Sequence, residues 1–379
     1  MTLSPTERAR YSRHLLLPEI GAAGQERLKA ARVLVVGAGG LGSPASLYLA
    51  AAGVGTLAIV DHDQVELSNL QRQLLFDTAS VGAGKALSAR ARLRSLNDEI
   101  DVVAHQVELR AANARELLAG HDCIIDGSDR LATRYLVNDA CVLLRLPLVS
   151  AAIHRFEGQA MTYLPGQGPC YRCLFPESAA GAAPSCAEAG VLGVLPGMLG
   201  ALQATEAIKV VLGIGAPLVG RLLTYDALAM EWHEFRFRRR SDCAVCGDAP
   251  TIRTLADSAA SCALDAAPLW PRVDAHELQR RLGAAGAAGQ AAPTVVDVRE
   301  AYEYEAGHLD GSVNIPLGQL ARRIGELPAH SPLVFVCRSG RRSQSACELS
   351  ARAGIQSVVD LEGGLLAWAA AVDPSIKVA

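Results

Sequence analysis

Hydrophobic and polar positions along the chain follow a repeating order of short buried strands and amphipathic helices. Apolar runs at Arg32–Val36 and Thr56–Val60 flank a glycine-rich turn and an alanine-rich helix. Strand, helix and strand in this order predict a right-handed parallel βαβ unit. Further apolar runs, which extend the predicted parallel sheet, lie at 101–107, 123–125 and 147–149.

The pattern loosens after Cys246 and then begins again. Residues 251–271 are rich in Ala, Ser, Asp and Pro, which predicts a short terminal strand followed by a linker. A helix from about Asp274 and three later strands predict a second, smaller α/β domain. Those strands are expected at 294–298, 333–337 and 357–361. We therefore expect a first domain over 1–255, a linker over 256–271 and a second domain over 272–379.

Length and composition agree with two α/β domains. The chain has 379 residues, of which 50% are hydrophobic but only 4% aromatic, as expected of close-packed α/β layers. The formal charge of −3 predicts no general attraction to nucleic acid or to anionic membranes. The basic run at 235–240 is interpreted as a solvated strand edge.

Targeting signals are not evident, so we expect a cytoplasmic protein. The first twenty residues are charged and lack the apolar core of a secretory signal. The most apolar run, 191–215, is interrupted by Pro196, Gln203, Glu206 and Lys209, which favours a buried helix over a membrane span. Ten cysteines in a cytosolic chain indicate metal binding or thiol chemistry before disulfides.

A glycine-rich loop follows the first predicted strand and opens a helix. Its sequence, GAGGLG over 37–42, contains Gly37, Gly39, Gly40 and Gly42, and Asp61 ends the next strand. Loop backbone and a helix N-terminus suit a phosphate, and the Asp61 carboxylate can accept from ribose hydroxyls. By itself this pattern fits an NAD-dependent dehydrogenase equally well, and a loop that merely packs a helix on a sheet also fits.

Charged residues after Asp61 favour ATP over a nicotinamide. The segment 68–73 (SNLQRQ), Lys85 and the segment 126–129 (DGSD) supply two cations and a carboxylate. This set can hold a triphosphate with Mg²⁺ and stabilise pyrophosphate as it leaves the α-phosphorus. Hydride transfer would need none of these residues.

Five segments carry a resemblance to a known family. The segments are 10–13 (RYSR), 36–42 (VGAGGLG), 52–55 (AGVG), 68–73 (SNLQRQ) and 81–85 (VGAGK). Over about the first 250 residues the chain resembles the MoeB/ThiF family, relatives of ubiquitin-activating enzymes. The resemblance implies a Rossmann-like doubly wound sheet and ATP-dependent adenylylation of the C-terminal glycine of a ubiquitin-fold sulfur-carrier protein that ends in Gly-Gly.

The resemblance also implies roles for individual residues. The implied ATP-binding residues are Gly37, Gly39, Gly40, Gly42, Asp61, Ser68, Asn69, Arg72, Gln73, Lys85, Asp129 and Arg130. Asp129 would hold Mg²⁺, and Arg72, Lys85 and Asp129 would take part in catalysis. Arg13 would reach the phosphates bound by the partner subunit of a homodimer. Arg130 stands where the family often has Asn, which leaves the contact of that side chain open.

Two CxxC pairs predict a zinc centre. Cys170 and Cys173 form one pair, Cys243 and Cys246 the other. Four thiolates at this local spacing suit tetrahedral Zn²⁺ with no open catalytic position, so the ion would staple an extension onto the first domain. A redox dithiol is the alternative for either pair alone, but neither follows a thioredoxin-like strand and helix.

The remaining cysteines of the first domain differ in their surroundings. Cys123 and Cys141 lie in apolar runs and are interpreted as core residues. Cys186 lies in a small-residue segment, where a thiol could be exposed. The family resemblance implies that Cys186 can bind the carrier covalently, as a thioester or an acyl disulfide, although some members manage without this cysteine.

Cys337 is the clearest nucleophile. It ends an apolar strand and opens the loop 337–343 (CRSGRRS), which leads into a helix. Loop amides, the helix dipole and nearby arginines would stabilise a thiolate or a persulfide anion. With the motifs at 297–300 (DVRE), 302–304 (YEY), 307–308 (GH) and 314–316 (NIP), the region 272–379 resembles a rhodanese.

Two rival interpretations of this loop fit its residues less well. A phosphatase of related fold needs Arg six residues after the cysteine, where this chain has Ser343 and places Arg342 one position early. A scaffold without activity would usually lack the cysteine. Sulfur transfer by Cys337 is therefore the expected chemistry.

Together the two domains predict one reaction sequence. The carrier carboxylate would be adenylylated, and a Cys337 persulfide, loaded by an upstream donor such as a cysteine desulfurase or thiosulfate, would displace AMP. Reductive cleavage, by Cys186 or another thiol, would release the carrier thiocarboxylate for molybdopterin, thiamine, thiolated tRNA or cysteine synthesis. The alternatives are a ubiquitin-like activator that works through a Cys186 thioester, an NAD-dependent oxidoreductase and a non-catalytic scaffold.

Overall fold

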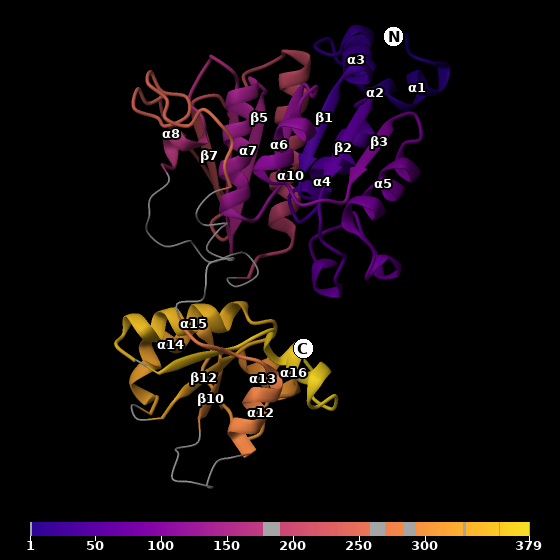
Figure 1. Ribbon diagram of the computed structural model, residues 1–379. Coiled ribbons are helices and arrows are strands. Elements are labelled where there is room, and N and C mark those ends of the chain that lie inside the picture. The colour runs from indigo at the N-terminus through magenta and orange to yellow at the C-terminus, as the bar shows by residue number, and fades with distance from the viewer. Residues whose placement is uncertain are drawn as a thin grey trace. The chain divides into compact units, whose positions relative to one another are not determined.

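A computed structural model describes residues 2–176, 190–257, 270–283, 293–328, 331–355 and 357–378. The chain forms two compact units, Met1–Asp265 and Ala266–Ala379, which Figure 1 colours from indigo to orange and from orange to yellow. The fold class is the predicted one: two α/β units of different size, each built on its own sheet. The exact limits of the domains and of the linker between them stay predictions.

Unit 1 is built on an eight-stranded sheet with the order β3-β2-β1-β4-β5-β6-β7-β8. The strands are β1 (Arg32–Val36), β2 (Thr56–Val60), β3 (Asp101–His105), β4 (Cys123–Asp126), β5 (Leu148–His154), β6 (Glu157–Tyr163), β7 (Arg221–Asp226) and β8 (Glu231–Arg236). Strands β1 to β5 pair in parallel. The order reverses direction between β1 and β4, which is the switch point where doubly wound sheets bind ligands.

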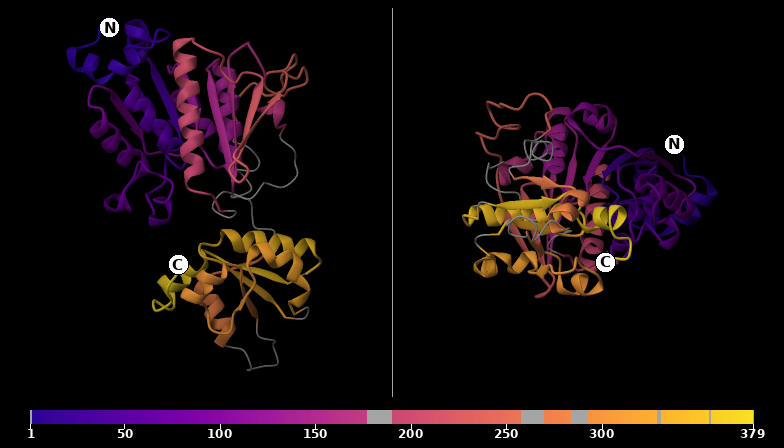
Figure 2. Two further views of the ribbon diagram at one scale, coloured as in Figure 1. Left: turned by 180° about the vertical axis from the view of Figure 1, so that it is seen from behind. Right: turned by 60° about the horizontal axis from the view of Figure 1, so that its bottom comes forward.

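Helices cover both faces of this sheet (Figure 2). One face carries α3 (Gly21–Ala30), α4 (Gly42–Ala52), α5 (Lys85–Leu96) and α10 (Val194–Leu212); the other carries α6 (Ala111–Leu118) and α7 (Leu131–Leu144). Alternate residues of β1 point to opposite faces, with Val33 and Val35 in one cluster and Leu34 and Val36 in the other. Burial on both faces explains why the strand is continuously apolar.

Helix α10 is long and apolar enough to cross a membrane by length and composition alone. In this structure it packs against α4 and the sheet, and Leu195 and Leu199 are fully buried. A Cβ at Gly200 would lie 2.4 Å from the carbonyl oxygen of Leu41, so the two helices approach closely there. The prediction of a buried helix agrees with this packing.

The N-terminal helices α1 (Pro5–Arg10) and α2 (Ser12–Leu15) lie near the amino ends of the parallel strands (Figure 1). Tyr11, between them, is buried against Gly53, shortly before β2 begins at Thr56. The side-chain amide of Asn97 donates to the Tyr11 hydroxyl over 2.8 Å. The glycine-rich loop after β1 is at the opposite, carboxyl edge.

Two parts of unit 1 differ from the predictions: the strands β6 to β8 and the segment that follows Thr251. Strands β6 to β8, which form an antiparallel extension, were not predicted apart from the edge around 235–240. The short strand expected after Thr251 was wrong, because residues 251–257 contain no strand. The amides of Thr251 and Ile252 both donate to the carbonyl of Ala244, which ties this segment to a turn instead of a ladder.

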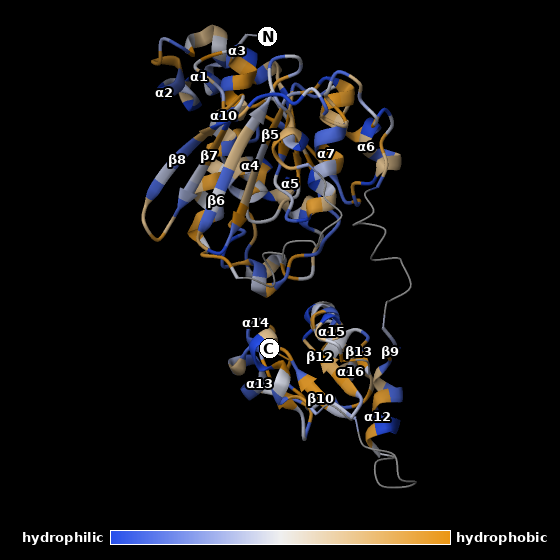
Figure 3. Ribbon diagram, turned by 90° about the vertical axis from the view of Figure 1, so that its left-hand side faces the viewer, coloured by the Kyte–Doolittle hydropathy of each residue, from blue (hydrophilic) through white to orange (hydrophobic). Residues whose placement is uncertain are grey.

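Unit 2 has an all-parallel five-stranded sheet with the order β11-β10-β12-β13-β9. The strands are β9 (Arg272–Val273), β10 (Thr294–Asp297), β11 (Val313–Asn314), β12 (Leu333–Val336) and β13 (Val358–Leu361). Figure 3 shows β10 and β12 in the hydrophobic colour, as expected of central strands that are buried on both faces.

Helices pack on each face of the unit 2 sheet. The helices are α12 (Ala275–Gly283), α13 (Ala301–Ala306), α14 (Leu317–Arg323), α15 (Arg341–Arg352) and α16 (Gly364–Ala371). Leu278 and Trp368 belong to the core on the face of α12 and α16; Leu320 and Cys347 belong to the core on the face of α14 and α15. Cys347 is therefore a packed residue.

Candidate active sites and metal centre

The glycine-rich loop joins β1 to α4 by close backbone packing. Gly37 has a φ of +86°, which residues other than glycine rarely adopt. A Cβ at Gly42 would stand 1.8 Å from the carbonyl oxygen of Gly37, whereas one at Gly39 would meet nothing nearer than 3.7 Å. Gly42 is thus required for the tight turn, and Gly39 leaves open backbone at its mouth.

Asp61 follows β2 and fixes the loop from the side. One carboxylate oxygen accepts from the amide of Ala38 and the other from the amide of Asp63, each over 2.8 Å. Burial raises the pKa of Asp61 above its ordinary value, while the charge of Lys85 acts in the opposite direction. The Asp61 carboxylate, which is predicted to bind a ribose, is therefore already oriented by the glycine-rich loop.

Residues 68–73 lie over the mouth of the glycine loop. Ser68 and Asn69 form part of a short 3-10 helix, η1 (Leu67–Asn69), and Arg72 donates to the carbonyl of Ser68 over 3.1 Å. The stem of Arg72 lies 3.6 Å from a Cβ built on Gly40. Gln73 is buried beside Gly39, and among the described residues its Oε1 has no hydrogen-bond partner.

Lys85 is the first residue of α5 and is buried. Its ammonium group donates to Asp63 Oδ2 over 3.1 Å, and its amide donates to the carbonyl of Asp63 over 2.9 Å. Asp63 thus holds the lysine side chain at the carboxyl edge, where its charge also acts on Asp61. Asp63 was not predicted as a site residue, although its spacing from Asp61 would place it on the same loop.

The loop after β4 packs directly on the glycine loop. A Cβ on Gly37 would meet the Gly127 carbonyl oxygen at 3.0 Å and the Ser128 amide at 3.3 Å. Asp129 extends from this loop with an exposed carboxylate that has no hydrogen bond or ion pair in the described part of the chain. An unengaged carboxylate beside the glycine loop fits the hard, oxygen-seeking Mg²⁺ ion.

Three predicted residues stand apart from this group. Arg130 directs its guanidinium to Glu108 over 2.9 Å, so the side chain is engaged in a surface ion pair. Arg13 is exposed on α2, near the amino ends of the strands, whereas the glycine loop of the same chain lies at their carboxyl ends. Cys186 lies outside the described residues.

The four predicted cysteine ligands come together in one cluster. Their Sγ atoms all lie within 4.8 Å of one another, with 3.7 Å between Cys170 and Cys243 and 3.3 Å between Cys173 and Cys246. Tetrahedral zinc with bonds of about 2.3 Å requires S···S separations of about 3.8 Å, so the cluster fits this ion. Hydrogen bonds among the clustered sulfurs lower the pKa of Cys173 and raise that of Cys170, and a bound metal would require all four as thiolates.

The cysteine cluster joins two short turns. Cys170 caps the four-residue helix α8 (Tyr171–Leu174), and Cys173 lies within it. The amide of Arg240 donates to Cys173 Sγ over 3.4 Å. A metal held here would connect the end of the sheet to α8 and would have a structural role, since all four positions would be taken by protein.

Cys337 opens the strand-to-helix loop of unit 2. Its sulfur accepts from the amide of Gly340 over 3.2 Å and lies 3.5 Å from the hydroxyl of Ser343. Gly340 has a φ of +88°, and Gly364 packs against the loop so closely that a Cβ would lie 2.4 Å from the Cys337 carbonyl oxygen. This turn aims backbone N–H at the sulfur, as a thiolate or persulfide anion requires.

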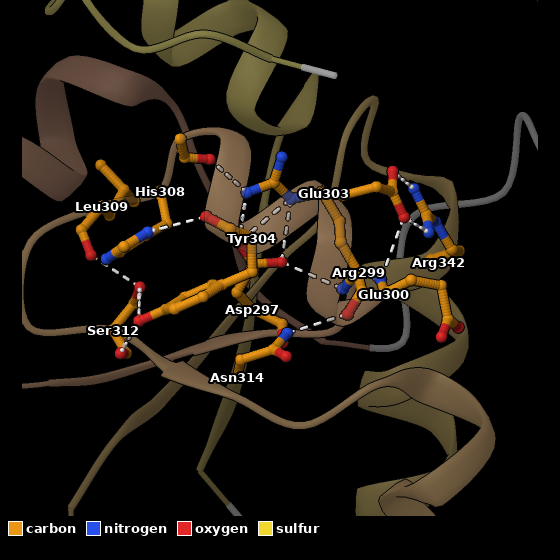
Figure 4. Close-up of polar contacts among 11 residues, drawn as sticks. Asp297, Arg299, Glu300, Glu303, Tyr304, His308, Leu309, Ser312, Asn314 and Arg342 are labelled. Atoms are coloured by element: carbon orange, nitrogen blue, oxygen red, sulfur yellow. Dashed lines mark hydrogen bonds and ion pairs between the residues drawn. The ribbon is translucent and has the colours of Figure 1, made fainter.

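A half-buried ion pair supports the sulfur loop (Figure 4). Arg342 makes two hydrogen bonds to the carboxylate of Glu303, over 2.6 and 2.7 Å. Burial acts to raise the pKa of Glu303, but hydrogen bonds from Arg342 and from the Glu300 amide bring it below its ordinary value. The bidentate pair anchors the first turn of α15 to α13.

A second pair in Figure 4 fixes the end of β10. Arg299 is fully buried and donates to Asp297 over 2.7 Å and to the carbonyl of Gly307 over 2.7 Å. Asn314 donates to the carbonyls of Asp297 and Arg299 over 3.0 and 2.8 Å. The motif residues around 297–316 therefore build the frame of the site and do not themselves supply a nucleophile.

Family comparisons match both units. Residues 11–245 match the model of the ThiF family, and residues 274–371 match that of the Rhodanese-like domain. The chain belongs to the ThiF family. This ThiF-family chain is 41% identical over 392 residues to "Adenylyltransferase and sulfurtransferase MOCS3" of Aedes aegypti, covering 99% of this chain and 90% of that protein.

Two bacterial relatives cover different shares of this chain. "Probable adenylyltransferase/sulfurtransferase MoeZ" of Mycobacterium tuberculosis is 42% identical over 99% of the ThiF-family chain and 96% of its own length. "Sulfur carrier protein adenylyltransferase" of Thermus thermophilus is 53% identical over 70% of this chain and 100% of its own. The crystal structure of Escherichia coli MccB with ATP matches with a TM-score of 0.56 at 25% identity, covering 62% of this chain and 74% of that one.

The comparisons give the class of chemistry. This ThiF-family chain is an enzyme, an ATP-using adenylyltransferase with a rhodanese-like sulfurtransferase domain. That result confirms the predicted family and reaction classes and removes the NAD-dependent oxidoreductase and scaffold alternatives. The roles of individual residues are not decided by it.

A buried polar network under the glycine-rich loop of this ThiF-family chain was not predicted. Asp126 is fully buried and accepts from Ser128 Oγ over 2.6 Å and from Ser150 Oγ over 3.0 Å. Gln203 of α10 donates to the carbonyl of Asp126 over 2.7 Å. A carboxylate that ends a fully apolar run was the available signal, because a buried charge must have partners.

Proposed function

We propose that this enzyme adenylylates the C-terminal glycine of a ubiquitin-fold sulfur-carrier protein and then converts it to a thiocarboxylate with sulfur carried by Cys337. One observation supports this most strongly: the glycine loop with Asp61 and Lys85 stands in one chain with a cysteine whose sulfur is held by loop backbone. The names of MOCS3 and MoeZ support the same pairing of reactions, and the name of the Thermus relative supports a sulfur-carrier protein as the substrate.

In the first step the carrier carboxylate attacks the α-phosphorus of ATP and pyrophosphate leaves. Arg72 and Lys85 would stabilise charge on the leaving oxygens, and Asp129 would hold Mg²⁺, which supplies Lewis-acid stabilisation of the phosphates. The glycine loop would receive phosphate on its backbone, and Asp61 would accept from the ribose. The product is an acyl adenylate, which is a far better acyl donor than a carboxylate.

In the second step the terminal sulfur of a Cys337 persulfide attacks the acyl carbon and AMP leaves. The product is an acyl disulfide between the carrier and Cys337. A thiolate, from Cys186 or from a cellular dithiol, then attacks Cys337 Sγ, which releases the carrier thiocarboxylate and leaves Cys337 in a disulfide with that thiol. The persulfide would come from a cysteine desulfurase or from thiosulfate, and a dithiol would restore the cysteine.

Arg13 supports a homodimer as the working form. It lies at the amino edge of the sheet and the glycine loop at the carboxyl edge, separated by five-residue strands of about 17 Å. An arginine side chain on the same chain cannot bridge that distance around the edge. A second copy would bring its Arg13 to the phosphates.

Carrier-dependent ATP–pyrophosphate exchange tests the proposal. With a ubiquitin-fold carrier that ends in Gly-Gly, we expect exchange that is lost when the last glycine is removed. Exchange that ignores the carrier, or none with any carrier offered, would contradict it. Carrier bound to Cys186 with Cys337 dispensable would instead favour the ubiquitin-like activator with a thioester.

A further inference from the structure

Two arginine–tyrosine pairs cross between α7 and α8. The guanidinium carbon of Arg134 on α7 lies 5.8 Å from the ring centre of Tyr171 on α8. In the reverse direction, Arg172 on α8 lies 4.5 Å from the ring centre of Tyr135 on α7. The two rings meet edge to face at 5.5 Å. All four side chains are buried, so each cation–π contact is shielded from water.

The α8 members of these pairs are the two residues between Cys170 and Cys173. Arg172 forms a bidentate pair with Asp139 over 2.7 and 2.8 Å, and the Tyr171 amide donates to Asn138 over 2.8 Å. One half of the metal centre is therefore fastened to α7 by side chains and backbone. Any displacement of these cysteines must displace Tyr171.

The α7 member, Arg134, reaches the nucleotide loop. It donates to the carbonyl of Ser128 over 2.8 Å, and its Nε lies 3.7 Å from Asp126 Oδ2. The Ser128 amide in turn lies against Gly37, and Asp129 is the next residue. A single buried guanidinium thus touches both the helix of the metal centre and the loop that carries the predicted Mg²⁺ ligand.

We propose that Arg134 and Tyr171 couple the cysteine centre to the nucleotide site, so that a metal ion on the four cysteines sets the affinity for ATP. Arg134 is a positioning residue in this account, because it acts on nucleotide through Ser128 and Asp129. The inference rests on the proposed function of unit 1. When a metal ion joins the four cysteines, α8 keeps the Tyr171 ring in place, and the ring keeps the Arg134 guanidinium in place. Without the metal, the Tyr171–Arg134 contact and the Arg134–Ser128 contact both loosen.

The first test removes the ring while the cysteines stay. In Tyr171→Leu, zinc content should remain at one ion per chain, while the dissociation constant of α,β-methylene ATP rises about tenfold. Tyr171→Phe, which keeps the ring, should restore near-normal affinity. Tyr163→Leu is the matched control, since Tyr163 is buried in the hydrophobic cluster that contains Cys170 and Cys173 but has no cation–π contact among the described residues.

The second test removes the metal. Stripping zinc from the full chain should raise the nucleotide dissociation constant about tenfold and speed hydrogen exchange in 127–130. In Arg134→Met, where the connection is already broken, metal removal should have less than a twofold further effect on affinity. This non-additivity distinguishes coupling from general loss of structure.

Unchanged nucleotide affinity in zinc-free protein, or metal removal and Arg134→Met acting independently, would overturn the coupling. A Tyr171→Phe variant as weak as Tyr171→Leu would also overturn it. If the zinc-loaded wild-type chain binds no nucleotide at all, the proposed function of unit 1 fails instead. Nucleotide binding by the intact enzyme therefore separates the two failures.

Discussion

Two strand-to-helix loops carry the proposed chemistry of this enzyme, and they are built on opposite plans. The loop between β1 and α4 presents backbone, and its charged partners come from the ends of other strands and from α5. The loop between β12 and α15 carries its own proposed nucleophile, Cys337, and its own amide donor, Gly340. A phosphate site is thus assembled from distant segments, whereas a sulfur site is nearly contained in seven residues.

The difference follows from what each loop must bind. A triphosphate is long and highly charged, so cations must surround it from several directions. A persulfide is attached to the chain and carries one negative charge on its terminal sulfur. Backbone amides of a single turn can therefore surround it. Substitutions should therefore separate the two loops cleanly.

Cys337→Ser should produce the largest effect. Without the thiol no persulfide forms, so we expect carrier thiocarboxylate formation to fall at least about a thousandfold. Carrier-dependent pyrophosphate exchange should stay within about twofold of wild type, because that loop needs no thiol. Mass spectrometry of the carrier gives the first rate. Cys347→Ala, at a packed cysteine of the same unit, is the control; equal loss in both variants would contradict the assignment.

Lys85→Met should be next in size. Loss of a buried cation beside the leaving pyrophosphate should lower the exchange rate about 100- to 1000-fold. Arg130→Met is the matched control, because the Arg130 guanidinium is engaged with Glu108 at the surface. Exchange assays at saturating ATP measure the ratio. Equal effects of the two variants would argue against a specific role for Lys85.

Glycine substitutions test the backbone plan directly. In Gly42→Ala the new methyl group would stand 1.8 Å from the Gly37 carbonyl oxygen, so the turn must open. A displacement of about 1 Å should reduce nucleotide turnover about a hundredfold. Gly39→Ala, where the nearest atom is 3.7 Å away, should fold normally and bind more weakly only if nucleotide approaches that backbone. Calorimetric titration with ATP distinguishes these outcomes.

Glu303→Gln should have the smallest effect, and one that depends on pH. The pKa of Glu303 is lower in the folded chain than in the unfolded chain, so ionised Glu303 stabilises unit 2 above an unfolded value of about 4.3. This contribution is lost as the pH falls through the lower, folded pKa. We expect a loss of about 2 kcal/mol at pH 7 that shrinks in acid. Urea unfolding at pH 7 and pH 3.5 checks the sign, and a loss that grows in acid would contradict it.

The same contrast explains how far sequence could predict the structure. Strand and helix alternation, the glycine loop and the sulfur loop are local, and their residues were placed on the expected elements. The four cysteines were also foreseen, because soft thiolates in CxxC pairs strongly favour one ion. The contacts of Asp126 with Ser150 and Gln203 were not, since partners 24 and 77 residues away leave no local pattern.

Two further features depend on partners that are distant in the sequence. Strand β6 pairs with β5, and β7 and β8 are added to it in turn. Strand β8 is exposed along its whole length, so the apolar periodicity that marks a buried strand is weak there. The role of Arg130 stays a prediction, and its guanidinium pairs with Glu108, 22 residues away in the chain. Long-range partners decide both cases.

The most direct test of the central claim is to trap the carrier on the enzyme. Cys337 is loaded as a persulfide, then mixed with a Gly-Gly carrier with and without ATP, and the products are digested without reductant and identified by mass spectrometry. We predict carrier joined through two sulfurs to the peptide of Cys337, only when ATP is present. A linkage that forms without ATP, or one found solely on another cysteine, would contradict the claim that adenylylation in unit 1 prepares the carrier for sulfur from unit 2.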